Sequence, residues 1–172
     1  MADGLERFVK AQQYDYDTAL REIRGGRKRS HWMWYIFPQL KGLGYSSTSQ
    51  YYGIRDLEEA KAYLQHPVLG PRLVEISEAL LTLDTDDAGA VMGYPDNLKL
   101  HSCMTLFELA AYDLAAPELH VFSRVMEKFF AGHQDRRTRD DLAAPELHVF
   151  SRVQEKYFAG HADRRTRELL GR

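Results

Sequence analysis

The chain has 172 residues, of which 44% are hydrophobic and 28% charged, and its formal net charge is −2. This composition is typical of a globular domain with a sizeable core, and the charge argues against broad non-specific nucleic-acid binding. The single cysteine, Cys103, excludes a disulfide framework and a thiolate metal cluster, and we expect neither a metal nor a cofactor. No run approaches the roughly 18 apolar residues of a membrane span, and the start lacks a signal-peptide pattern. We therefore expect no membrane association and a cytoplasmic location.

Two amphipathic helices are predicted at the N-terminal end. The first begins at Leu5 and is interrupted by the polar glutamines at residues 12–13. Asp17 is a favourable N-cap for a second helix, which the glycine pair at residues 25–26 ends.

The segment His31–Phe37, with the sequence HWMWYIF, is apolar on nearly every side. Periodicity alone does not distinguish a buried strand from a buried helix in so short a run. We favour a helix, because its neighbours are helical and Ser30 is a good N-cap.

The middle of the chain alternates loops and helix starts. Residues 41–49 are rich in Gly and Ser and predict a loop. Asp56 and Glu59 form a capping-box pattern that opens a helix, Pro71 suits the first turn of the next helix, and residues 95–96 introduce another. We therefore predict an all-α fold, a single-domain irregular (orthogonal) helical bundle.

The C-terminal part contains a near-identical tandem repeat, residues 113–140 and 141–168. The two copies differ only at four pairs of positions: Met126 and Gln154, Phe129 and Tyr157, Gln134 and Ala162, Asp140 and Glu168. Such similarity indicates a recent or engineered duplication. We expect a helical domain over residues 1–140, which includes the first copy, followed by a duplicated C-terminal helix segment over residues 141–172.

Only one copy of the repeat helix can fill one place in a core. Gln154 and Tyr157 put polar atoms where the first copy has Met126 and Phe129, and an unpartnered buried amide costs about 1–3 kcal/mol. The first copy is therefore expected in the core. The second copy is expected to pack against another molecule, giving a homodimer through the duplicated helix or a domain swap. Each repeat helix is expected to start at its proline, Pro117 or Pro145, and the arginine-rich run at residues 136–139 is expected at a solvated helix end.

Several residues around the aromatic segment are candidates for ligand binding. Lys28 and Arg29, beside a helix N-terminus, suit a phosphate or form a solvated basic turn. His31 is a candidate base or bonds a backbone group. Trp34 and Tyr35 suit stacking on a flat ring or core packing.

A second group of candidates lies further along the chain. Lys99 and Ser102 share one side of a predicted helix. The predicted pocket would combine His31, Trp34 and Gln39 with Lys99. Cys103 is a candidate nucleophile only if its pKa is lowered, and its apolar surroundings favour a buried inert thiol.

Several motifs resemble the domain-of-unknown-function 1810 family over nearly the whole chain. They are Phe8 to Gln12, Ser30 to Leu40 (SHWMWYIFPQL), Gly42 to Gly44, Tyr63 to Pro67, Lys99 to Phe107, and the tail with its Phe-Phe-Ala-Gly and Arg-Thr-Arg-Glu-Leu-Leu elements. The resemblance implies a compact, mostly helical single domain and no established activity. The chain departs from the family pattern by carrying the tail segment twice.

These observations suggest a small-molecule or nucleotide/phosphate-binding domain, with a pocket near the His-Trp-Met-Trp run for a small anionic ligand. The alternative is a protein-interaction module without catalysis, in a chain made to test helix duplication. No Ser-centred elbow, Gly-rich phosphate loop or HExxH motif is present, so no reaction is assigned.

Overall fold

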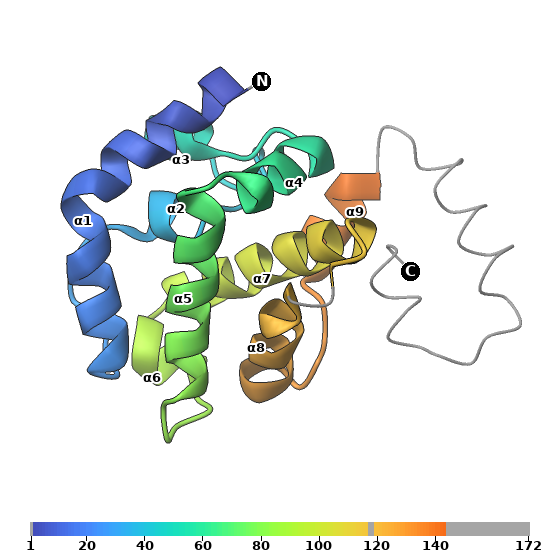
Figure 1. Ribbon diagram of the computed structural model, residues 1–172. Coiled ribbons are helices and arrows are strands. Elements are labelled where there is room, and N and C mark those ends of the chain that lie inside the picture. The colour runs from blue at the N-terminus through green and yellow to red at the C-terminus, as the bar shows by residue number, and fades with distance from the viewer. Residues whose placement is uncertain (1, 117–118, 144–172) are drawn as a thin grey trace, which may run out of the picture.

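The computed structural model describes residues 2–116 and 119–143, and the predicted all-α, single-domain class is confirmed (Figure 1). Within those residues the only strand-like pairing is an isolated bridge between Leu40 and Ile54. The elements are η1 (Ala2–Leu5), α1 (Glu6–Arg24), α2 (Met33–Ile36), α3 (Ser47–Tyr52), α4 (Leu57–Gln65), α5 (Leu69–Leu81), α6 (Ala88–Met92), α7 (Asp96–Asp113), α8 (Val121–Phe130) and α9 (Arg136–Ala143).

The N-terminal helix α1 is continuous, so the predicted interruption at residues 12–13 is wrong. Gln12 is buried, and its amide nitrogen donates to the carbonyl of Tyr35 (2.8 Å) and to the hydroxyl of Tyr63 (2.9 Å). A polar side chain with such partners can occupy a core-facing helix position without breaking it. The helix ends at Arg24, and Gly26 has a φ of +86°, in agreement with the predicted glycine stop.

The aromatic segment forms a helix of one turn, α2, and its predicted cap is wrong. Trp32, and not Ser30, is the N-cap residue. The Ser30 hydroxyl instead donates to the carboxylate of Glu22 at 2.5 Å, because the segment before α2 folds back onto α1.

Side-chain caps define two of the middle helices. At α4, the Asp56 carboxylate accepts from the backbone N–H of Glu59 (2.9 Å), which confirms the predicted helix start. The predicted loop at residues 41–49 is too long, because α3 begins at Ser47. The hydroxyl of Ser46 accepts from the N–H of Ser49, which is a favourable capping arrangement.

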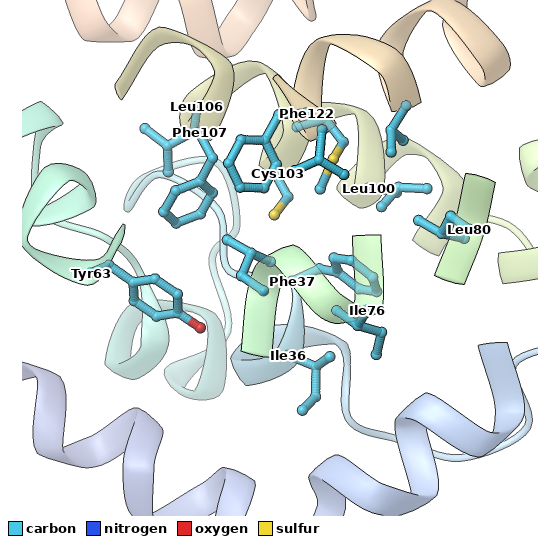
Figure 2. Close-up of a cluster of buried hydrophobic side chains, with 14 of the residues drawn as sticks. Ile36, Phe37, Tyr63, Ile76, Leu80, Leu100, Cys103, Leu106, Phe107 and Phe122 are labelled. Atoms are coloured by element: carbon cyan, nitrogen blue, oxygen red, sulfur yellow. The ribbon is translucent and has the colours of Figure 1, made fainter. Parts of the chain in front are cut away.

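The core is built around α7, which packs against α4, α6, α8 and α9, while α5 packs against α1, α4 and α8. Figure 1 shows α1 beside α5, with α7 crossing the molecule. Figure 2 shows the apolar side chains that meet between these helices, among them Phe37, Ile76, Phe107 and Phe122. None of the described helices has both the length and the apolar character that crossing a bilayer requires.

The first copy of the repeat lies in the core. Phe122 and Met126 of α8 are completely buried, and Leu119 and Phe129 pack beside them. The arginine-rich run opens α9 rather than closing a helix, because the carboxylate of Asp135 accepts from the third N–H of the run at 2.9 Å. The predicted helix start at Pro117 and the second copy from residue 144 onward lie outside the described residues.

Candidate functional site

The structure brings two of the predicted site residues, Lys28 and Lys99, together around one carboxylate. The Lys28 ammonium lies 2.8 Å from one oxygen of Asp96, and the Lys99 ammonium lies 3.1 Å from the other. Desolvation opposes ionisation of Asp96, but hydrogen bonds from both lysines outweigh it and lower its pKa. Lys28 is only 8% exposed and also donates to the carbonyl of Ser30 (2.5 Å). Its ammonium is therefore largely engaged within the protein.

The two tryptophans of the aromatic segment have different environments. Trp34 is half-buried, and the Lys99 ammonium lies 4.3 Å from its ring centre, a cation–π distance. Trp32 is only 1% exposed, and its indole N–H donates to Glu22 at 2.9 Å. Trp32 is therefore a core residue, whereas Trp34 borders the surface. The Asp96 cluster is defined here as Lys28, Asp96, Lys99 and Trp34.

Glu22 organises the chain between α1 and α2. Its carboxylate accepts from the backbone N–H groups of Arg29 and Ser30, from the Ser30 hydroxyl and from Trp32. Desolvation raises its pKa, but these hydrogen bonds prevail and lower the pKa to about 2. The Arg29 side chain is exposed, and so is His31, whose carbonyl accepts from the Tyr35 hydroxyl at 3.3 Å.

The remaining predicted site residues have other contacts, and none of these contacts involves the Asp96 cluster. Gln39 is buried, and its carbonyl accepts from the N–H of Ile54 at 2.8 Å. Ser102 is buried, and its hydroxyl donates to Asp135 at 3.2 Å. Cys103 is completely buried, and burial raises the pKa of its thiol, which agrees with an inert core thiol. In the part of the chain that the structure describes, His, Cys, Asp and Glu side chains form no group suited to a metal ion.

A second cluster of basic residues surrounds a cavity of about 470 Å³. We call this cavity the basic cup. It lies where η1 and the start of α1 meet the end of α3 and the chain leading into α4, near the N-terminus in Figure 1. Its lining comprises Gly4, Glu6, Arg7, Lys10, Lys41, Gln50, Tyr51, Gly53, Arg55 and Glu59.

Arg7 joins the chain segments that form the cup. Its guanidinium donates to the carbonyls of Tyr51 (2.7 Å), Gly53 (2.8 Å) and Gly4. It also pairs with the buried carboxylate of Glu59 at 3.4 Å. A guanidinium with its donors directed to fixed acceptors is well suited to joining segments, so Arg7 fixes the end of α3 against α1.

Glu59 completes this framework beneath the cup. One of its oxygens accepts from the backbone N–H of Arg55 at 2.7 Å, and the other faces Arg7. The Arg55 guanidinium lies 3.8 Å from Glu59 and 3.2 Å from Asp56, and remains 57% exposed. The buried negative charge of Glu59 is therefore balanced by Arg7, whereas Arg55 stays accessible.

Two lysines add open positive charge to the cup. Lys10 and Lys41 are exposed, and neither forms an ion pair with any residue in the described ranges. Lys41 is held close to Gly53, where an added Cβ would lie 2.6 Å from the Lys41 Cα. Such a close approach needs a glycine. Lys10 and Lys41 are thus the unpaired cations of the cup, and Arg55, although paired with Asp56 and Glu59, keeps more than half of its side chain exposed to a ligand.

The basic cup does not show in the sequence as a motif, because its residues come from four separate segments. Arg7 and Lys10 are spaced i, i+3, so their common side of α1 was readable from the helical period. No local pattern joins them to Lys41 or Arg55.

The comparisons with known proteins identify the family. Residues 2–142 match the model of a family described as a protein of unknown function, DUF1810, and the chain belongs to this family. The predicted membership is therefore confirmed. Among solved structures, the chain is similar to the crystal structure of the conserved hypothetical protein Rv1873 from Mycobacterium tuberculosis. The two are 46% identical, with a TM-score of 0.75, over 81% of this chain and 96% of that chain. No curated protein matches.

Proposed function

We propose that the protein binds a small anionic ligand, a phosphate-type dianion, in the basic cup. The observation that carries this proposal is that Lys10, Lys41 and Arg55 border one cavity, of about 470 Å³, whose buried carboxylate is already paired. Clefts lined by one sign of charge attract ions of the opposite sign, and the volume lies in the range of small-molecule sites.

The charge of the cup favours phosphate over a monoanion. Four cationic and two carboxylate side chains line it, an excess of two positive charges among the lining residues, although Arg55 also pairs with Asp56 outside the lining. A phosphate monoester carries about −1.5 to −2 at neutral pH. Arginine also offers paired N–H donors to phosphate oxygens, which suits Arg55 to direct contact.

Calorimetric titration of the full chain with inorganic phosphate tests the proposal. We expect saturable binding, and Arg55→Gln should weaken it about tenfold, since a hydrogen bond to a charged group is worth roughly 1.5–3 kcal/mol. The matched control is Arg24→Gln, because Arg24 is also a paired surface arginine and is 60% exposed. Equal affinities in the two variants, or no binding at millimolar phosphate, would contradict the proposal.

The Asp96 cluster is the alternative place for the anion, because it contains Lys28, Trp34 and Lys99, which were predicted to bind the ligand. Its two lysines share one carboxylate, so it carries one excess positive charge, and Lys99 keeps part of its surface exposed. Lys99→Gln in the same titration separates the two locations. Weakening by Lys99→Gln and not by Arg55→Gln would place the ligand at the Asp96 cluster.

A second candidate function is protein interaction, and a groove of about 840 Å³ favours it. The groove lies between α7 and α8, and its apolar lining includes Ala111, Ala115 and Leu119. We propose as its occupant the second repeat copy of another chain, whose sequence repeats the apolar stripe with Leu147 and Phe150. Reciprocal contacts would give a symmetric dimer.

Light scattering over a range of concentrations tests this interaction. The full chain should form a dimer, and a variant with both Leu147→Asp and Phe150→Asp should be a monomer with an unchanged helical circular dichroism spectrum. A full chain that is monomeric at every concentration would contradict it.

A further inference from the structure

We infer that the ligand of the basic cup is a phosphate ester that carries a flat aromatic ring, as a nucleoside monophosphate does, and that the ring stacks on Tyr51. This inference rests on the proposed function and names the class of ligand for the same site. Its basis is that Tyr51 lines the same cavity as Lys10, Lys41 and Arg55.

The backbone around Tyr51 is fixed relative to the cations. Its carbonyl accepts from the Arg7 guanidinium at 2.7 Å, in the same arrangement that holds Gly53 against Lys41. The cup therefore offers its aromatic ring and its cations from one framework, which lowers the entropy cost of ligand binding.

The ring of Tyr51 packs against a neighbouring ring and is otherwise largely exposed. It meets Tyr52 edge-to-face, with ring centres 4.8 Å apart, and Tyr52 in turn packs against Phe8 and Tyr35. Tyr51 nevertheless remains 61% exposed. A supported aromatic ring with an open surface is the arrangement on which nucleobases stack.

Exposure alone does not single out Tyr51. Tyr14, Tyr45 and Tyr94 are more exposed, yet none of them lines the cup. What distinguishes Tyr51 is that a phosphate held by Lys41 and Arg55 and a ring held by Tyr51 would occupy the same cavity. A single small molecule with both groups would then contact all three residues.

The test compares three ligands by calorimetric titration of the full chain: inorganic phosphate, ribose 5-phosphate and adenosine 5′-monophosphate. Ribose 5-phosphate has a hydroxyl group in place of the adenine base, so the difference in affinity between the two esters measures the contribution of the base. We expect adenosine 5′-monophosphate to bind about tenfold more tightly than ribose 5-phosphate, as stacking on one aromatic side chain allows.

Variants of Tyr51 then assign this difference. Tyr51→Leu should abolish the preference for adenosine 5′-monophosphate and leave phosphate affinity unchanged, whereas Tyr51→Phe should keep the preference. Tyr14→Leu is the control for loss of an exposed tyrosine outside the cup. Equal affinity for the two esters, or a preference that survives Tyr51→Leu, overturns the inference while phosphate binding upholds the proposed function. No binding of any of the three ligands overturns both.

Discussion

The Asp96 cluster and the basic cup contain similar residues but use them differently. Both combine lysines with an aromatic ring. In the cluster, Lys28 and Lys99 share Asp96, and Lys99 also lies over Trp34. In the cup, Arg7 and Arg55 pair with the buried carboxylate of Glu59, whereas Lys10 and Lys41 border the cavity without an ion-pair partner among the described residues. The difference is whether the positive charge is balanced inside the protein or left for a ligand.

This contrast explains why a conspicuous motif need not mark a ligand site. The His-Trp-Met-Trp run is rich in aromatic and polar side chains because it joins α1 to the core. Glu22 receives hydrogen bonds from Ser30 and Trp32, and Trp32 is buried. The cup has no comparable motif, yet it borders a cavity of about 470 Å³.

The largest predicted effect concerns the structural role of the aromatic run. Trp32→Ala should lower the free energy of unfolding by about 3–5 kcal/mol, the usual cost of removing a buried tryptophan. Trp34→Ala should cost clearly less, because Trp34 is half-buried. Urea unfolding of both variants measures this, and equal losses would remove the distinction drawn between the two rings.

The next effect is a pH dependence of stability that Glu22 should produce. Its pKa is lowered to about 2 in the folded state from an ordinary value near 4.5. The stabilisation is therefore present above about pH 4.5 and is lost as the pH falls toward 2, and it amounts to at most about 3 kcal/mol. Urea unfolding against pH should show a smaller loss of stability at acid pH in Glu22→Gln than in the wild type. The exposed Glu78→Gln serves as the control, and an unchanged pH profile in Glu22→Gln would refute the assignment.

Part of this architecture was predictable from local sequence. The cap at Asp56, the glycine stop after Arg24 and the helical class all follow from short-range chemistry. The continuity of α1 was not predictable, because Gln12 finds its partners at Tyr35 and Tyr63, which are distant in sequence.

The candidate sites show the same division. The sequence named Lys28, Trp34 and Lys99, and the structure adds Asp96 as the group that joins them. The cup depends on Gly53 approaching Lys41, a contact between segments that no periodicity encodes.

A smaller loss of stability should follow from adding a methyl group where Gly53 lies against Lys41. Gly53→Ala places a Cβ 2.6 Å from the Lys41 Cα, and overpacking of this kind costs about 1–3 kcal/mol. Because Lys41 must move, phosphate affinity should also fall. Gly25→Ala is the control, since its added Cβ would meet neighbours only at 3.4 Å or more. Thermal unfolding and phosphate titration report the two losses, and a neutral Gly53→Ala would mean that Lys41 is not held by this contact.

The smallest change in stability is expected for a substitution at an unpaired lysine of the cup, compared with one at a paired lysine of the Asp96 cluster. Lys41→Gln should alter the free energy of unfolding by no more than about 0.5 kcal/mol, as is usual at exposed positions. Lys28→Gln should cost about 1–3 kcal/mol, because it leaves Asp96 with one partner fewer in a largely buried site. Urea unfolding compares the two, and similar losses would show that the charges of the cup are also structural.

The most direct measurement is the phosphate titration of three proteins side by side: wild type, Arg55→Gln and Lys99→Gln. Both substitutions remove one positive charge from a basic cluster, but only Arg55 borders the basic cup. Weakening by about tenfold in Arg55→Gln, with Lys99→Gln close to wild type, is the predicted result. If Lys99→Gln loses phosphate affinity and Arg55→Gln retains it, the account is contradicted, and the anion binds at the Asp96 cluster instead.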